Sequence, residues 1–244
     1  AEYLRATTPG ATPDEQAGLI SQVHRFCHAY QLNRPPSHLD AVAARKPFIR
    51  LDSTGMAPGL SLGEGQKWHL FLSHIWSTGQ DANATIKRQL CLLLPGVSIF
   101  LDVDDLQDIG ALEEYVDATA VIMIFVSKGY FKSGNCLREA RRAVQEEKPI
   151  VLVHDPVKGG AKLEVIKLEE CPAELRGPIF DGRDVIEWHR IKDFQLVSLK
   201  LLAEQLLLGR PTSKGGERVP LYIPGELTMK RWAFAHIISY HIIS

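Results

Sequence analysis

The segment SGNCLREARRAV (residues 133–144) places one acidic side chain, Glu139, near the start of a predicted amphipathic helix. The segment follows a continuous apolar run at residues 120–127, which is typical of a strand covered on both faces. A carboxylate in the first turns of a helix could simply be favoured by the helix dipole. It could also be the one carboxylate of an active site, stabilising a positive charge that develops during a reaction. The sequence leaves both interpretations of Glu139 open.

Other side chains that could take part in catalysis or binding lie in three loops, each directly after a predicted strand. They are Ser73, His74 and Trp76 in the first loop, Asp102, Asp104, Asp105, Asp108 and Gly110 in the second, and Ser127, Ser133 and Cys136 in the third. The acids could bind a cation or be solvated, and the glycine permits a turn. The two serines of the third loop are candidates for capping or for ligand contact. No histidine stands at a recognisable spacing from Cys136, which favours a small packing residue over a nucleophile.

Composition excludes several classes of partner. The net charge of −1 provides no field that would favour nucleic acid or an anionic membrane. No apolar run approaches the roughly 18 residues that span a bilayer. The four cysteines form no C-x-x-C pair, which argues against a zinc site or a disulfide framework and indicates free thiols in a reducing, cytoplasmic compartment. The chain is expected to be a piece of a longer protein, because it lacks an initial Met and stops within an apolar segment.

Short apolar runs alternate with amphipathic segments from Trp68 to Gly209. The predicted strands are residues 68–73, 97–103, 120–127, 149–155 and 182–188, and the predicted helices are residues 80–94, 111–119, 136–147 and 194–209, with weaker helical character at 161–175. This alternation implies a parallel, doubly wound sheet with helices on both faces. Ligands of such sheets bind outside the carboxyl ends of the strands. All three loops are therefore expected at the same edge of the sheet.

The chain divides into three predicted regions, which are an N-terminal helix and linker (1–67), a main domain (68–209) and a C-terminal extension (210–244). Thr12, Pro13 and Glu15 match a capping box, which together with apolar residues at helical spacing predicts a helix over 12–32. The main domain has no G-x-G-x-x-G after its first strand, and the chain has no G-x-x-x-x-G-K-[ST]. An ordinary dinucleotide-binding domain and a P-loop enzyme are therefore disfavoured.

Three segments, in order, resemble the successive boxes of a TIR (Toll/interleukin-1 receptor-like) domain. They are WHLFLSH (68–74), VSIFLDVDDLQDIGALEEYVDATAVIMIFVSKGYF (97–131) and SGNCLREARRAV (133–144). The resemblance covers about residues 68–208 and implies a flavodoxin-like, doubly wound, five-stranded parallel sheet, here with helical N- and C-terminal extensions. It also places the BB loop of that family at residues 102–110.

The resemblance implies two classes of function. Some TIR domains are NAD+ nucleosidases, in which the glutamate matching Glu139 is the catalytic carboxylate; others are signalling adaptors. The first class predicts cleavage of the nicotinamide–ribose bond of NAD, with cyclisation of ADP-ribose as a further outcome, in signalling or defence. NAD would be the substrate, no other cofactor is expected, and self-association through the BB loop is expected. The implied substrate-pocket candidates are Ser73, His74, Trp76, Asp102, Gly110, Ser133 and Cys136.

One departure favours the second class. Asn135 stands where the family usually has a tryptophan that shapes the pocket. The alternatives are thus a non-catalytic scaffold that binds other TIR domains, or a sensor that binds a nucleotide without turnover. For the enzyme, one carboxylate suffices, because nicotinamide leaves as a neutral base and the ribosyl group becomes oxocarbenium-like. A helix N-terminus would keep Glu139 ionised, whereas burial would raise its pKa.

Overall fold

The computed structural model describes residues 48–105, 109–209 and 219–223. Residues Phe48–Ile223 form one compact unit, which therefore reaches beyond the predicted 68–209 domain at both ends. The helix expected at 12–32 lies outside the described residues, as does the chain after residue 223. Among the described helices, none is both long and apolar enough to cross a membrane.

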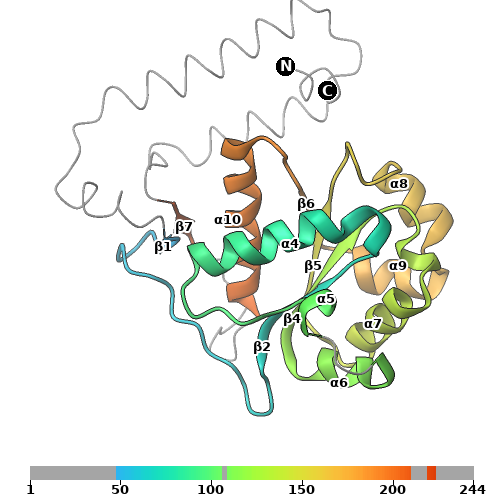
Figure 1. The fold of residues 1–244 in the computed structure, drawn as a ribbon, viewed down its shortest axis with the longest axis horizontal. Helices are drawn as coiled ribbons and strands as arrows, with labels where there is room; N and C mark the ends of the chain where they lie inside the picture. Colours follow the sequence, from blue (N-terminus) through green and yellow to red (C-terminus); the bar gives the residue numbers. More distant parts are fainter. Residues whose placement is uncertain (1–47, 106–108, 210–218, 224–244) are drawn as a thin grey trace, which may run out of the picture. The chain divides into compact units, whose positions relative to one another are not determined.

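A five-stranded parallel sheet lies at the centre of this unit (Figure 1). Its strands are β2 (Trp68–Ser73), β3 (Ile99–Phe100), β4 (Thr119–Val126), β5 (Ile150–His154) and β6 (Val185–Glu187). Their order is β3-β2-β4-β5-β6, and every neighbouring pair is parallel. The chain starts at β2, adds β3 on one side and all later strands on the other, which is the flavodoxin-like order. The predicted flavodoxin-like α/β fold is confirmed.

Strand β4 is central because all eight of its residues are buried. Its alternate residues point to opposite faces of the sheet, as strand geometry requires. One set joins the first core cluster and the other set joins the second, namely Val121, Met123 and Phe125 against Ile122, Ile124 and Val126. A continuously apolar sequence is thus what a strand between two helical layers needs.

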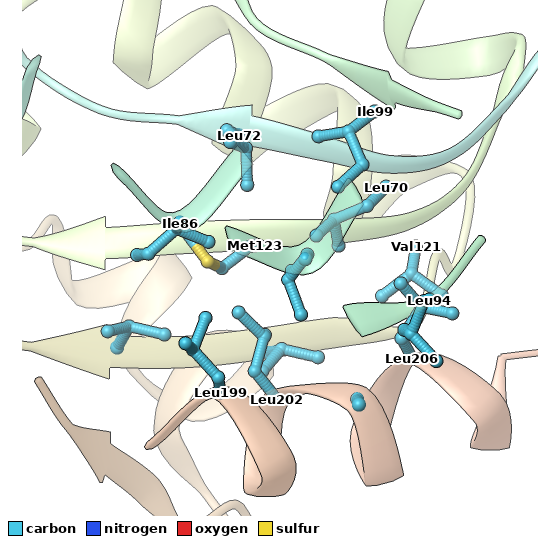
Figure 2. Packing of buried hydrophobic residues seen from close by; sticks show 14 of the residues in the cluster. Leu70, Leu72, Ile86, Leu94, Ile99, Val121, Met123, Leu199, Leu202 and Leu206 are labelled. Atoms are coloured by element: carbon cyan, nitrogen blue, oxygen red, sulfur yellow. The ribbon is translucent and has the colours of Figure 1, made fainter. Parts of the chain in front are cut away.

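The helices cover both faces of the sheet. On the first face lie α4 (Trp76–Leu93) and α10 (Lys192–Leu208), and on the second lie α6 (Leu112–Asp117), α7 (Gly134–Gln145) and α9 (Ala173–Phe180). Figure 2 shows the first layer, where Ile86 and the α10 leucines pack against alternate residues of β2 and β4. Short turns complete the unit, namely α5 (Asp102–Asp105), η1 (Ile109–Ala111), η2 (Tyr130–Lys132), α8 (Leu163–Val165) and the π-helical η3 (Ile166–Glu170).

Strand β3 is shorter than the predicted strand over 97–103, and that boundary was wrong. The chain leaves the extended conformation after Phe100 and forms the helical turn α5 from Asp102. The Asp105 carboxylate accepts a hydrogen bond of 2.8 Å from the backbone N–H of Leu101, and the Asp105 N–H donates to the Leu101 carbonyl at 2.9 Å. Acidic side chains that bond to nearby backbone in this way compete with strand pairing.

A second, two-stranded sheet closes one side of the unit. Strand β1 (Arg50–Leu51) pairs antiparallel with β7 (Leu221–Tyr222), which joins residues far apart in the sequence. Ile49 and Leu221 are fully buried in the core cluster that also contains residues of α4 and α10. Residues before 68 and after 209 therefore contribute to the same core as the main sheet.

The substitution Ile49→Ala should lower the free energy of unfolding by about 2–4 kcal/mol, because it leaves a cavity in a well-packed core. Ile49 is 0% exposed. Leu92→Ala is the matched control, since Leu92 is 60% exposed on α4, and it should cost less than about 1 kcal/mol. Guanidinium unfolding of both variants measures the difference. If Ile49→Ala lowered the free energy of unfolding as little as Leu92→Ala does, the segment before β2 would not belong to the core.

Candidate active site

The carboxyl ends of β2 and β4 meet at the topological switch point of the sheet, because strand addition reverses direction between them. Open α/β sheets bind their ligands in this crevice. The register of the pair places Ser73, the last residue of β2, beside Ile124 of β4. The chain then continues from β4 through η2 into α7, which returns across the same edge.

Glu139 lies at this switch point and is buried, with only 5% of its surface exposed. The Ser73 hydroxyl donates a hydrogen bond of 2.5 Å to Glu139 Oε2, and its oxygen lies 2.5 Å from Tyr130 Oη. A serine hydroxyl has one proton, so when that proton goes to Glu139 the Tyr130 hydroxyl must donate to Ser73. The result is a buried chain of hydrogen bonds from Tyr130 through Ser73 to Glu139.

Helix α7 is set in place by the turn that precedes it. Gly129 adopts a φ of +87°, which favours glycine, and leads into η2. Ser133 is the N-cap of α7, and its side chain accepts a hydrogen bond of 3.4 Å from the backbone N–H of Cys136. Cys136 and Glu139 are three residues apart, so both side chains project from the same, buried face of the helix.

Burial decides the electrostatics of Glu139. Removal from water raises the pKa of Glu139 to about 8, a hydrogen bond from Ser73 lowers it, and the nearby negative charge of Asp102 raises it. The helix N-terminus therefore does not keep this carboxyl ionised at neutral pH. An acid with such a pKa in a ligand-binding crevice is a candidate for chemistry rather than a solvated helix charge.

A second group of side chains follows β2. His74 is buried, and its Nδ1–H donates to the Leu72 carbonyl at 3.2 Å, which leaves Nε2 without a proton in the neutral ring. Nε2 lies 3.9 Å from Asp102 Oδ1, while Trp76 Nε1 donates to Asp102 Oδ2 at 2.5 Å. Burial lowers the pKa of His74, and Asp102 acts in the opposite direction.

Cys136 connects the two groups. Its thiol donates to the His74 carbonyl at 3.2 Å, and burial raises the pKa of Cys136 to about 12. A thiol with so high a pKa is not ionised and is a poor nucleophile. Cys136 therefore packs α7 against the β2–α4 connection.

The structure brings six of the eight sequence-predicted residues together, namely Ser73, His74, Trp76, Asp102, Cys136 and Glu139. Ser133 lies beside them as the helix cap, and Gly110 is exposed in η1. Ser127 donates to or accepts from the Thr78 hydroxyl at 2.8 Å. Asn135, which replaces the expected tryptophan, is exposed at the start of α7.

The acidic loop does not act as one group. Asp104 and Asp105 form ion pairs of 3.0 and 2.7 Å with Lys87, whereas Asp102 faces His74, and Asp108 lies outside the described residues. Within the residues that the structure describes, no group of three or more metal-ligating side chains could hold a metal ion.

Two residues were missed by the sequence reasoning. The Tyr130 hydroxyl completes the chain to Glu139, and its only signal was an aromatic side chain in the loop after an apolar strand. A Cβ at Gly79 would lie 3.1 Å from His74 Cβ and 3.2 Å from Phe125 Cδ1. The first turn of α4 therefore packs tightly against His74 at Gly79.

The strand order and the site at its switch point define a flavodoxin-like α/β domain. No protein-family model and no curated protein matches the sequence. Among solved structures, the chain is similar to a metazoan TIR-STING receptor from C. gigas in complex with 2′,3′-cGAMP, with 14% identity and a TM-score of 0.41, over 58% of this chain and 42% of that one. A second structure of a metazoan TIR-STING receptor from C. gigas gives 14% identity and a TM-score of 0.39, over 58% and 43%. The chain thus spans less than half the length of these structures.

Glu139→Gln should make the protein more stable at alkaline pH. The pKa of Glu139 rises from 4.5 to about 8 on folding, so between these values the unfolded chain ionises first and the folded state loses stability as pH increases. The Gln variant lacks this loss, and the difference should be absent below about pH 4.5 and reach a few kcal/mol above about pH 8. Chemical unfolding of both proteins at several pH values measures it.

Glu113→Gln is the matched control, because Arg138 lowers the pKa of the Glu113 carboxyl through a hydrogen-bonded ion pair. This group contributes stability above its unfolded pKa and loses it as pH falls, so the control should change stability in the opposite direction. A difference between wild type and Glu139→Gln that does not vary with pH would contradict a buried, ionisable Glu139.

Proposed function

We propose that this protein is a TIR-domain NAD+ nucleosidase that cleaves the nicotinamide–ribose bond in signalling or defence. The observation that carries the proposal is the buried Glu139 carboxyl at the switch point of the sheet, 2.5 Å from the Ser73 hydroxyl. The three TIR-like segments support it, because they supply Ser73, Tyr130 and Glu139 in turn.

The chemistry requires little beyond this carboxylate. Nicotinamide departs with the bonding electrons as a neutral base, so its departure needs no general acid. The ribosyl carbon then carries the positive charge of an oxocarbenium ion. An ionised Glu139 stabilises that cation more strongly in a water-excluded site than it would in solution.

Ser73 and Tyr130 support the ionised form. The Ser73 hydrogen bond lowers the pKa of Glu139 against the effect of burial. The Tyr130 hydroxyl, 2.5 Å from Ser73 Oγ, makes Ser73 a better donor when it donates to that oxygen. Cyclisation of ADP-ribose would follow from the same cation if adenine rather than water attacked it.

The enclosure of Glu139 favours an alternative, which is a non-catalytic TIR scaffold acting through TIR–TIR interactions. An enclosed carboxyl that only links α7 to β2 would be structural, and the exposed Asn135 provides no ring beside it. The two functions differ in whether purified protein releases nicotinamide. We propose self-association for either function, on the strength of the TIR resemblance, so assays should cover a range of protein concentrations.

Purified protein should release nicotinamide from NAD, and Glu139→Gln should lower the rate about 10²–10³-fold, because the variant keeps the size of the side chain but cannot carry the charge. Glu174→Gln makes the same chemical change on an exposed side chain that pairs with Arg141 of α7 at 3.3 Å, and it should keep the wild-type rate. Chromatographic detection of nicotinamide measures all three. Equal turnover in wild type and Glu139→Gln would refute the catalytic role, and no turnover in any protein would favour the scaffold.

Nicotinamide release should rise with pH and level off above about 8, because the pKa of Glu139 is raised to about 8 and the ionised form is the active one. Ser73→Ala removes the hydrogen bond that lowers this pKa, so its midpoint should shift to higher pH. Initial rates at saturating NAD across the range give both midpoints. A rate that is independent of pH between about 6 and 9 would contradict the assignment of Glu139.

A further inference from the structure

His74 carries a buried nitrogen that has no hydrogen-bond partner among the described residues. Its Nδ1–H is directed to the Leu72 carbonyl, so the neutral ring presents a lone pair at Nε2. Nε2 is fully buried and unpartnered, and the 3.9 Å to Asp102 Oδ1 is too long for a hydrogen bond. A buried acceptor left in this way lowers the stability of the fold, because no hydrogen bond offsets its removal from water. Such groups call for an explanation, and one explanation is a catalytic role.

The position of His74 connects this nitrogen to Glu139. Ser73, the preceding residue, holds the Glu139 carboxyl, and the Cys136 thiol of α7 donates to the His74 carbonyl. Asp102 influences the ionisation of both His74 and Glu139. Gly79 of α4 packs so close to His74 that a Cβ at Gly79 would lie 3.1 Å from His74 Cβ. An unprotonated imidazole nitrogen therefore lies at the same edge of the sheet as the candidate catalytic carboxyl, and both face the charge of Asp102.

The proposed reaction still needs a group that accepts the proton of the attacking water. Water that attacks the ribosyl cation must lose a proton as its oxygen bonds to the ribose carbon. Glycoside hydrolysis commonly divides such work between two groups, one of which takes the proton of the attacking water. In the proposed reaction Glu139 stabilises the cation. Cys136 and Tyr130 have raised pKa values, so both stay protonated and cannot accept a proton.

We propose that His74 Nε2 accepts the proton of the water molecule that attacks the ribosyl cation, an inference that rests on the proposed function. The bond between nicotinamide and ribose breaks with its electron pair leaving on nicotinamide. A water oxygen then bonds to the ribose carbon while one O–H bond breaks and its proton moves to Nε2. The imidazolium is paired with Asp102 and releases the proton to solvent. The sum is NAD+ and water giving nicotinamide, ADP-ribose and a proton.

The exposure of the neighbouring side chains indicates the direction of access. The His74 side chain is 0% exposed and the Asp102 side chain 16%, whereas Trp76 is 60% exposed. The way from Nε2 to solvent thus leads past the carboxylate and the indole that binds it. The proposal therefore requires that water enters past the Trp76–Asp102 pair.

Hydrolysis can be separated from capture of the cation by a nucleophile that has no proton to lose. The ring nitrogen of 3-acetylpyridine attacks with a lone pair and carries no hydrogen, so exchange of this base for nicotinamide needs no proton acceptor. Exchange still needs Glu139, because it passes through the same cation. The ratio of exchange to hydrolysis therefore reports only the contribution of the proton acceptor to hydrolysis. It does not depend on the fraction of active protein.

The test uses the full chain with His74→Asn, in which the amide can still donate to the Leu72 carbonyl but has no basic nitrogen. Proteins are incubated with NAD and 3-acetylpyridine, and ADP-ribose and the exchanged dinucleotide are quantified. The expected result is a rise of about 10²-fold in the ratio of exchange to hydrolysis, the usual size of a general-base effect. His154→Asn is the matched control, because His154 is also buried at a strand end with Nδ1 2.8 Å from a backbone carbonyl, and its ratio should equal that of wild type.

Asp102→Asn provides a second variant if His74→Asn does not fold, since it removes the charge that stabilises the imidazolium and should raise the ratio as well. An unchanged ratio in the folded variant overturns the role of His74 and leaves the role of Glu139 intact. Loss of both products in Glu139→Gln, with a raised ratio in His74→Asn, supports both assignments. No nicotinamide release by wild type in the presence or absence of 3-acetylpyridine overturns the proposed function and this inference together.

Discussion

The register of β2 against β4 is the constraint on which the rest of the site depends. It places Ser73 on the face of the sheet that Phe71 shares and that α7 covers. A slip of one residue would turn Ser73 to the opposite face, under α4 and α10. The Ser73 hydroxyl could then reach neither Tyr130 nor Glu139. Because both strands are buried on both faces, such a slip would also exchange two core clusters, so the hydrophobic packing protects the geometry of the site.

Helix α7 is fixed from its outer side as well. Arg138 forms two hydrogen bonds with Glu113 of α6, at 2.7 and 2.5 Å, and Arg142 forms two with Asp117, at 2.7 and 2.6 Å. Surface ion pairs contribute little stability on average, but paired arginine–carboxylate contacts restrict orientation. The charges on this outer face of the helix thus align α7 with α6 and hold Glu139 over β2.

Local patterns in the sequence predict the elements well. The apolar run 120–127 corresponds to β4 and the segment 136–147 to α7, each within two residues at either end. Contacts between distant residues were beyond such patterns. Ser73 lies 57 residues from Tyr130 and 66 from Glu139, and β1 pairs with β7 across nearly the whole unit. Loop position placed Ser73, His74 and Asp102 at the correct edge, but the burial that raises the pKa of Glu139 follows only from packing.

Asp102 connects access to the site with the protonation states within it. Its negative charge raises the pKa of both Glu139 and His74. If Asp102 moved outward with Trp76, both pKa values would fall. Glu139 would then ionise more readily and His74 would stay neutral, which are the forms that the proposed cation stabilisation and the proposed proton acceptance require. When Asp102 returned, it would favour the imidazolium and so complete proton uptake. In the proposed mechanism, Asp102 at the start of α5 would therefore affect both access to the site and the charge of both groups, without a change in the sheet that positions them.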